Sequence, residues 1–287
     1  MRKRCLYSRH AVPFPSNFHL DHKVRNPFLF EQIKRPILVS YIGGSSSDSP
    51  FTSRMRGEML TYCKQHSSAC KRAHYSKSNE RDPNLNEEAD NPQYKVYLRS
   101  VFCLQPIGDL PTRKGLFDGI MFGCIPVVFH PLSASAMYTW HWSTQLWKEI
   151  VVEIPMNVMD PSKPVLLSDP IQYLKHMMET EPEKVAHRQK LLRRHAFELS
   201  YSLEFYQAGN STNWPLDEKG QPLRDAYDIS MDHILGLHSG KLVEEPLVVD
   251  AIWREEMKIA VAEKYSNEFF AALKPNVSRE GKHAGAN

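Results

Sequence analysis

The stretch Phe102–Phe129 reads FCLQPIGDLPTRKGLFDGIMFGCIPVVF, and it predicts a strand, a loop, a helix and a second strand. A short apolar run ends at Gln105, and a polar turn follows it. The amphipathic segment Lys114–Phe122 then leads through a glycine into a second apolar run, Ile125–Phe129. This alternation is typical of one unit of a parallel α/β sheet.

Thr112 and Arg113 stand where this helix is expected to begin. A helix start presents unpaired backbone N–H groups and a partial positive charge, and an adjacent guanidinium can bind phosphate in bidentate fashion. Asp118 follows on the helix, where its carboxylate can accept hydrogen bonds from sugar hydroxyls. The pattern therefore predicts a nucleotide-phosphate site. The alternatives are that Arg113 is a solvent-exposed charge and that Asp118 pairs with Lys114 four residues earlier.

The composition of the 287-residue chain is that of an ordinary globular protein, with 41% hydrophobic and 24% charged residues. Its 36 Lys and Arg against 33 Asp and Glu give a formal charge of +3, and the basic residues form no long stripe. A nucleic-acid partner is therefore not expected. No apolar run approaches the roughly 20 residues of a membrane-spanning helix, and the first residues lack the apolar region of a signal peptide.

The five cysteines are too scattered for a zinc site and too few for a disulfide scaffold. Cys103 and Cys124 lie beside apolar strand residues, so we expect buried thiols there. Cys63 and Cys70 lie near a polar turn and could form a disulfide in an oxidising lumen. The sequence leaves that pairing open.

A second strand is predicted at Ile37–Ile42, and it ends at Gly43 and Gly44. A helix over Ser53–Gln65, which carries Arg56, is expected next. A strand that runs into glycines and then a helix suits anion binding, because glycine lets the backbone approach a ligand closely. The alternative is a flexible connection without a ligand.

The other expected elements follow from turn signals and apolar spacing. Tyr138–Trp142 is expected to lie in the core rather than in a cleft wall, because aromatic rings dominate core burial. Basic residues of the helix that begins at Pro182 are expected to form its solvated face. The predicted segments are a polar loop at Ser67–Asn91, a strand at Ile150–Pro155, and helices at Tyr94–Arg99, Asp169–Thr180, Pro182–Tyr206, Asp225–Leu237 and within 243–274.

A longer pattern resembles the exostosin-like glycosyltransferases. It contains S-x-F-C-L-Q-P-x-G-D-x-x-T-R-x-x-x-F-D-x-I-x-x-G-C-I-P-V-x-F-H-P, preceded by Y-x-G-G and R-x-R-G and followed by Y-T-W-H. The segment V-P-F-P-S-N-F-H at Val12–His19 resembles the V-P-Y-P-T-x-F-H of the plant-type branch that includes the xyloglucan galactosyltransferases. The resemblance extends from Val12 to about Pro155.

The resemblance implies a GT-B architecture, in which two Rossmann-like domains enclose the active site and the C-terminal domain binds the sugar nucleotide. On this basis residues 35–240 are the donor domain. Residues 1–34 are a remnant of the acceptor domain or an interdomain segment, and 241–287 are a helical extension with a disordered tail. The chain then lacks most of the acceptor domain, the membrane anchor and the stem, so we expect it to be truncated at its N-terminus.

The function implied by the resemblance is transfer of a galactose-like hexose from a UDP-sugar to a polysaccharide or glycan hydroxyl, with inversion. The alternative is a non-catalytic nucleotide-sugar-binding remnant or a scaffold subunit that pairs with another glycosyltransferase. The expected donor-binding residues are Gly43, Gly44, Arg56, Ser100, Gln105, Asp109, Thr112, Arg113 and Asp118. Among these, Ser100, Gln105 and Asp109 are expected to face one cleft from the strand edge.

No D-x-D triplet occurs in the sequence, so no metal cofactor is expected and cationic side chains would carry the diphosphate charge. The residue that takes the acceptor proton is not assigned, because in GT-B enzymes that group often comes from the acceptor domain. His19 is a weak candidate for it. The resemblance implies a Golgi membrane protein with a luminal catalytic domain.

Overall fold

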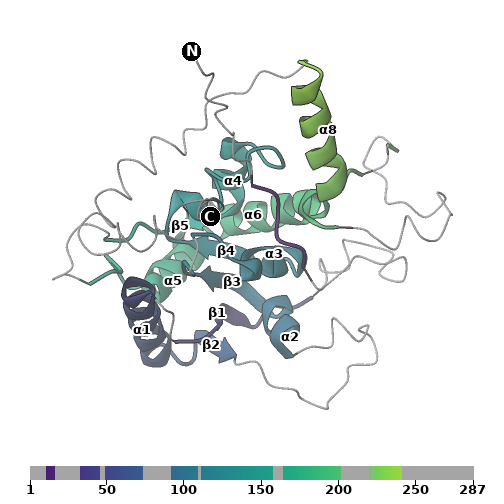
Figure 1. Ribbon diagram of the computed structural model, residues 1–287. Coiled ribbons are helices and arrows are strands. Elements are labelled where there is room, and N and C mark those ends of the chain that lie inside the picture. The colour runs from purple at the N-terminus through teal and green to yellow at the C-terminus, as the bar shows by residue number, and fades with distance from the viewer. Residues whose placement is uncertain are drawn as a thin grey trace, which may run out of the picture.

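The computed structural model describes residues 11–16, 33–45, 49–73, 92–108, 111–157, 164–201, 220–221 and 223–240. These residues form a parallel β-sheet with helices on both of its faces, as Figure 1 shows. The predicted α/β class is confirmed.

Within the described ranges the sheet has five strands in the order β2-β1-β3-β4-β5, and all neighbouring strands are parallel. Val39 on β1 pairs with Cys70 on one side and with Phe102 on the other. The chain thus moves outward from β1 to β2 and then returns past β1 to β3. The strands are β1 (Ile37–Ile42), β2 (Cys70–Ala73), β3 (Ser100–Gln105), β4 (Ile125–Val128) and β5 (Val152–Glu153).

Helices α1 (Pro50–Gln65) and α5 (Pro170–Thr180) cover one face of the sheet, whereas α2 (Pro92–Leu98), α3 (Lys114–Met121) and α4 (Thr144–Ile150) cover the other (Figure 1). Helix α6 (Pro182–His195) contacts both α4 and α5. Side chains of β3 alternate between the two layers, as a strand requires. Phe102 and Leu104 pack with α1 and α5, and Cys103 between them packs with α2 and α3.

Helix starts follow the capping residues of the sequence. The Ser49 hydroxyl caps α1, the Asp169 carboxylate caps α5, and Asp225 caps α8 (Ala226–His238). In α1 and α5 a proline occupies the first turn, where its missing N–H costs no hydrogen bond. The predicted helices at α5 and α8 are therefore confirmed, and α1 begins three residues before the expected Ser53.

Three expected boundaries are wrong. The strand β2 lies inside the predicted loop Ser67–Asn91, because pairing with β1 forms it without an apolar run. The helix from Pro182 ends at His195 instead of Tyr206 and continues as a short 3-10 turn. Ile150, expected in a strand, completes helix α4. The predicted helix within 243–274 lies outside the described residues.

The basic face of α6 is not uniformly solvated, contrary to expectation. The Arg188 Nη1 donates to the carbonyl oxygens of Lys148, Glu149 and Val151 at 3.0, 2.9 and 2.7 Å, so it closes the C-terminal end of α4. Its burial lowers the pKa of the Arg188 guanidinium. Arg193 is also partly buried.

Arg35 performs a similar task at the amino ends of the strands. Its Nη1 donates to the carbonyls of Tyr97 at 3.2 Å and Ser100 at 2.8 Å, and its Nη2 donates to the carbonyl of Phe122 at 2.8 Å. One side chain thereby joins the segment before β1 to the ends of α2 and α3. Burial, and the nearby charge of Arg193, lower the pKa of Arg35 to about 10.

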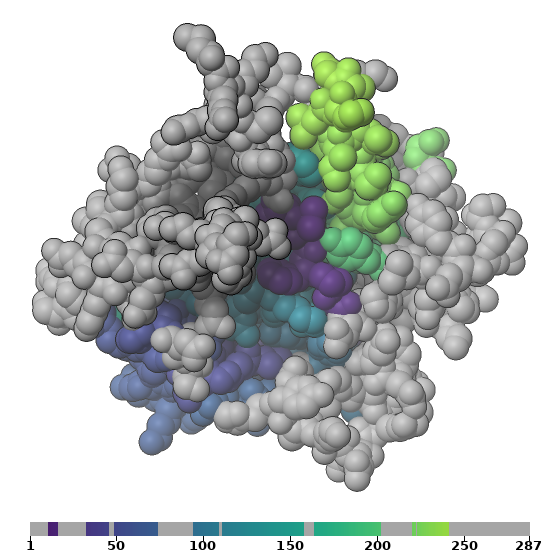
Figure 2. Space-filling model, viewed as in Figure 1, coloured from purple at the N-terminus to yellow at the C-terminus, as the bar shows by residue number. Residues whose placement is uncertain are grey.

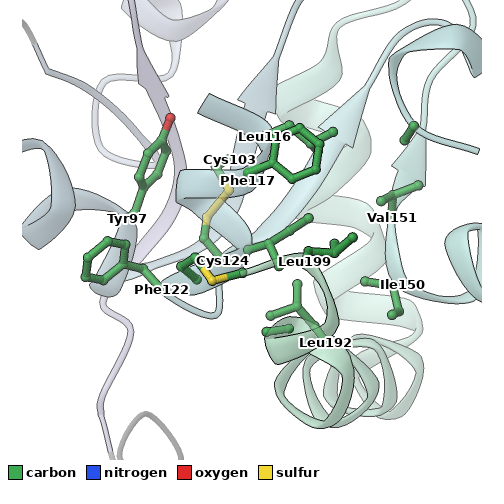
Figure 3. Close-up of a cluster of buried hydrophobic side chains, with 14 of the residues drawn as sticks. Tyr97, Cys103, Leu116, Phe117, Phe122, Cys124, Ile150, Val151, Leu192 and Leu199 are labelled. Atoms are coloured by element: carbon green, nitrogen blue, oxygen red, sulfur yellow. A yellow bond between two sulfur atoms is a disulfide. The ribbon is translucent and has the colours of Figure 1, made fainter. Parts of the chain in front are cut away.

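Both cysteine pairs form disulfides. Cys63–Cys70 joins the end of α1 to β2 with Cα atoms 5.1 Å apart, and Cys103–Cys124 joins β3 to the residue before β4 with Cα atoms 5.9 Å apart. Figure 3 shows Cys103 and Cys124 within the apolar cluster beneath α3. The pairing of Cys63 with Cys70, which the sequence left open, is therefore present. The expectation of buried free thiols at Cys103 and Cys124 is wrong. The parallel pairing of β3 with β4 brings these two residues within disulfide range.

The aromatic segment belongs to the core, as predicted, since Tyr138 and Trp142 are 1% and 0% exposed. Trp140 instead stacks on His233 of α8, with ring centroids 5.0 Å apart. The Nε2 of His141 lies 3.2 Å from the Ala226 carbonyl oxygen, and burial lowers the pKa of this imidazole to about 4. In the part of the chain described, its buried Nδ1 has no hydrogen-bond partner.

The segment 11–16 is extended, as expected, and lies across α3. The ring of Phe14 lies 6.2 Å from that of Phe117, centroid to centroid, and the Tyr201 hydroxyl donates to the Pro13 carbonyl at 2.9 Å. Figure 2 shows the segment at the surface beside α8. Part of the N-terminal region thus packs on the helix whose first residues were predicted to bind phosphate.

Candidate functional site

The sheet order places a topological switch point between β1 and β3. The connections leave these two strands on opposite faces of the sheet, so a crevice is expected outside their carboxyl ends. Gly43 and Gly44 directly follow β1, and the loop that leads to Arg113 follows β3. Two sequence regions that were separately predicted to bind an anion therefore meet at one edge of the sheet.

Arg113 connects the two regions directly. It is the N-cap residue of α3, with extended dihedral angles of −150° and 152°, and its side chain caps no helix N–H group. Instead, its Nη2 donates to the carbonyl oxygen of Ile42 at 2.9 Å, at the end of β1. The Nη1 atom is buried and has no hydrogen-bond partner among the described residues. A guanidinium in this state can still donate to a ligand oxygen.

Gln105 lies beside Arg113 at the end of β3 and is 1% exposed. Its Nε2 donates to the Tyr97 hydroxyl at 3.4 Å, whereas its Oε1 is buried without a partner in the described ranges. Burial raises the pKa of Tyr97, and the positive charge of Arg113 opposes this shift. Tyr97 was not predicted as a site residue, because only the packing of α2 against α3 brings it here.

Two glycines allow these side chains to approach the backbone. A Cβ at Gly43 would lie 2.7 Å from the Tyr41 hydroxyl oxygen and 3.2 Å from the Arg113 Nη2. A Cβ at Gly115 would lie 3.0 Å from the Gln105 Oε1 and 3.2 Å from the Arg113 Nε. All four distances are shorter than ordinary van der Waals contacts, so a side chain at either position would displace the Arg113 guanidinium.

Both carboxylate oxygens of Asp118 accept hydrogen bonds. Lys114 donates to each of them at 2.8 Å, and the Ser16 hydroxyl donates to Oδ1 at 2.6 Å. The pairing with Lys114, named above as an alternative, is therefore present. The residue is 8% exposed. Ser16 was not predicted as a partner, because it precedes Asp118 by about a hundred residues.

Thr112 and Ser100 do not face the crevice. The Thr112 hydroxyl lies 2.5 Å from the Tyr138 hydroxyl, whose pKa burial raises to about 12. Ser100 stands at the amino end of β3, where its hydroxyl donates to the Val96 carbonyl at 2.6 Å. The expectation that Ser100 shares a cleft with Gln105 is wrong, because the two residues occupy opposite ends of one strand.

The first turns of α1 support the loop after β3. The Arg56 Nη2 lies 3.5 Å from the Ile107 carbonyl oxygen, and the Thr52 hydroxyl donates to the Gly108 carbonyl at 3.2 Å. Arg56 thus lies near the expected site. The Gly44 carbonyl accepts a hydrogen bond of 2.7 Å from Tyr41. Asp109 lies outside the described residues, as does His19.

No group of three or more His, Cys, Asp or Glu side chains that could hold a metal ion occurs in the described ranges. The expectation that no metal is needed stays a prediction for a binding experiment. In those same ranges, no helix has the length and apolar character needed to cross a membrane.

The order of the strands and the positions of the connecting helices define a doubly wound α/β protein. The chain belongs to the exostosin family: the Exostosin GT47 domain matches residues 2–166, in agreement with the motifs of the sequence. A GT-B type fold is consistent with this family.

Three curated relatives, all from Arabidopsis thaliana, illustrate the similarity. The probable xyloglucan galactosyltransferase GT14 is 37% identical over 46% of this chain and 25% of its own length. The xyloglucan galactosyltransferase MUR3 is 33% identical over 46% of this chain and 20% of its own length. The xyloglucan-specific galacturonosyltransferase 1 is 29% identical over 78% of this chain and 30% of its own length. The matched part of the chain therefore spans 20% to 30% of the length of these relatives.

Proposed function

We propose that this chain carries the donor-binding half of a glycosyltransferase that moves a hexose from a UDP-sugar to a polysaccharide hydroxyl. The family and the names of the relatives support transfer to a polysaccharide such as xyloglucan. A galactose-like donor sugar and inversion of the anomeric carbon are part of the proposal.

The observation that carries the proposal is the pair of buried polar atoms without partners in the described residues, Arg113 Nη1 and Gln105 Oε1. Buried polar atoms are nearly always hydrogen-bonded, so such exceptions call for an explanation. They lie at the switch point, where doubly wound folds bind ligands. A diphosphate oxygen would satisfy the guanidinium, and a sugar or base donor would satisfy the amide oxygen.

Departure of UDP places negative charge on the diphosphate, and fixed cations stabilise that charge. In the proposal, Arg113 binds the diphosphate directly and Arg56 adds positive charge across the loop after β3. The glycines after β1, Gly43 and Gly44, let the backbone come close to the phosphates. Asp118 accepts from the ribose hydroxyls, for which the Ser16 hydroxyl must release Oδ1 or share it. Thr112 then supports the loop instead of the ligand.

The protein is proposed to act in the lumen of the Golgi. Two disulfides support an oxidising compartment, since such bonds persist in secretory compartments and are rare in the cytosol. A catalytic base is not assigned.

Isothermal titration calorimetry with UDP tests the proposal. Wild type should bind UDP, and Arg113→Ala should weaken binding by about tenfold to a hundredfold, the effect of one charge-assisted phosphate contact. Arg54→Ala is the matched control, because Arg54 is 39% exposed on α1 and pairs with Glu58 at 3.9 Å.

Absence of UDP binding by the wild type would refute the donor site. Equal affinity in Arg113→Ala would refute the role of this arginine. Repeating the titration with Mn²⁺ and with EDTA tests the metal-free expectation separately, and a requirement for Mn²⁺ would overturn that part alone.

A further inference from the structure

The amide of Gln105 lies against α3 beside two glycines that are one helical turn apart. A Cβ at Gly119 would lie 3.5 Å from the Gln105 Nε2, and a Cβ at Gly115 would lie 3.0 Å from its Oε1. The amide nitrogen is therefore nearer the middle of α3, and the amide oxygen is nearer its start, where Arg113 is the N-cap residue. The glycines thus let a buried acceptor approach the end of the helix that was predicted to bind phosphate.

Tyr97 and Arg113 determine which end of this amide faces the helix start. The Gln105 Nε2 donates to the Tyr97 hydroxyl at 3.4 Å, and burial raises the pKa of Tyr97, so the phenol stays neutral. The charge of Arg113 attracts the oxygen end of the amide dipole, whereas a reversed amide would turn its NH2 group toward that charge. Figure 3 shows the Tyr97 hydroxyl directed away from Phe122, the C-cap residue of α3. In this orientation Oε1 is an acceptor to which no group of the described residues donates.

The position of this acceptor relative to Arg113 limits the ligand group that can reach it. A Cβ at Gly115 would lie 3.0 Å from Gln105 Oε1, 3.1 Å from the Tyr97 hydroxyl and 3.2 Å from Arg113 Nε. A group that donates to Oε1 therefore lies next to the group that Arg113 binds. In a UDP-sugar held by its diphosphate, the nearest hydroxyl groups belong to the hexose beside its anomeric carbon and to the ribose, whereas uracil lies beyond the ribose.

We propose that Gln105 Oε1 accepts a hydrogen bond from the C2 hydroxyl of the transferred hexose, and that Tyr97 positions the amide for this contact. The inference rests on the proposed function, which assigns the diphosphate to Arg113 and the ribose hydroxyls to Asp118. A donor sugar without the C2 hydroxyl leaves a buried oxygen unpaired, and such a loss is unfavourable. Gln105 is then a specificity-determining residue, and Tyr97 is a positioning residue that acts through it.

Calorimetry on the full chain with UDP-galactose and with UDP-2-deoxygalactose tests the contact. The wild type should bind UDP-galactose about fivefold to tenfold more tightly, the effect of one hydrogen bond. Gln105→Leu should abolish this preference, and Tyr97→Phe should reduce it to about twofold, because the amide is then free to rotate. Tyr94→Phe should keep the preference. It is the matched control, because Tyr94 is a buried tyrosine of the same helix whose ring stacks on Phe122, with centroids 4.8 Å apart.

The ratio of the two affinities within one variant separates a lost contact from a general loss of structure, which would weaken both ligands alike. A wild type that binds UDP without preferring UDP-galactose to its 2-deoxy analogue would overturn this inference alone, whereas a wild type that binds no UDP would overturn the donor site as well. A preference retained in Gln105→Leu would overturn the contact, as would an equal loss of affinity for UDP and both sugar nucleotides. An unchanged preference in Tyr97→Phe would refute the positioning role.

Discussion

Arg35 and Arg113 stand at opposite ends of the same pair of strands, and both donate to backbone carbonyls. Arg35 makes three such bonds, to the ends of α2 and α3 and the start of β3. Arg113 makes one, to Ile42, and its Nη1 is buried without a partner among the described residues. Arg35 therefore completes the scaffold, whereas Arg113 has donor capacity that the scaffold does not use. The difference indicates how a structural arginine and a ligand-binding arginine can be distinguished.

The largest effect is expected for a substitution of Arg35, the structural arginine of this comparison. Arg35→Ala removes the donors of three carbonyls, and we expect a loss of roughly 3–5 kcal/mol in the free energy of unfolding. Urea unfolding measures it, with Lys34→Ala as the control, because Lys34 is the exposed neighbour. A loss below about 1 kcal/mol would show that Arg35 is not a scaffold residue.

His141 tests whether a buried atom without a partner is enough to mark a ligand site. Its folded pKa of about 4 lies below the ordinary histidine value of 6.5, so its neutral form stabilises the fold fully above pH 6.5. Stability should fall as the pH drops from 6.5 toward 4, by at most about 3 kcal/mol from this group. His141→Gln should flatten that dependence in urea unfolding, and UDP affinity at pH 7 should not change.

The matched control for this experiment is His187→Gln, since His187 is exposed on α6. It should leave the pH dependence of unfolding as in the wild type. If His141→Gln weakens UDP binding as Arg113→Ala does, His141 also contributes to the ligand site, and the expectation that its Nδ1, unpartnered among the described residues, has no role in binding is wrong.

Gly43→Ala tests the ligand-binding role of Arg113, the second arginine of the comparison. Its Cβ would collide with the Tyr41 hydroxyl and press on Arg113 Nη2, so we expect UDP affinity to fall about tenfold through the displaced guanidinium. Gly57→Ala is the control, because a Cβ there meets nothing within 4 Å on helix α1. That control should raise stability by about 0.5–1 kcal/mol. Equal UDP affinity in Gly43→Ala and wild type would argue against the close approach.

The smallest effect is expected at Ser16. Ser16→Ala removes one hydrogen bond to Asp118 and leaves the pair with Lys114, so stability should fall by about 1 kcal/mol or less. Because Oδ1 is then freer to accept from ribose, UDP should bind about twofold to threefold more tightly. A UDP analogue without the 2′- and 3′-hydroxyls should show no such gain. A weaker affinity for UDP itself would contradict the proposed role of Asp118.

The unit from β3 to β4 could be predicted closely, because apolar runs, a glycine and an amphipathic helix alternate over a short distance. Local signals also placed the starts of two helices near Asp169 and Asp225, where α5 and α8 begin. The strand β2 could not be predicted, since its CKRA sequence has no apolar run and it depends on pairing with β1. The end of α6 at His195 likewise lacks a glycine or proline signal.

The residues of the candidate site likewise include some that the sequence predicted and others that depend on tertiary packing. The sequence predicted separately that Arg113 and the glycines after β1 suit an anion, and the family resemblance implied that they bind one donor; the sheet places them at the same edge. The contact of Ser16 with Asp118 and the place of Tyr97 depend on tertiary packing, which one sequence does not encode locally. Ser100 was misplaced because the strand carries it to the far edge from Gln105.

The Cys103–Cys124 disulfide has a consequence for the continuity of the chain. Together with the backbone between them, the two cysteines form a closed covalent ring that includes Gln105, Arg113 and Asp118. If a protease cuts one peptide bond within this ring, the two fragments remain joined and separate only after reduction. Gln105, Arg113 and Asp118 would thus remain one covalent unit after a single cut within the ring.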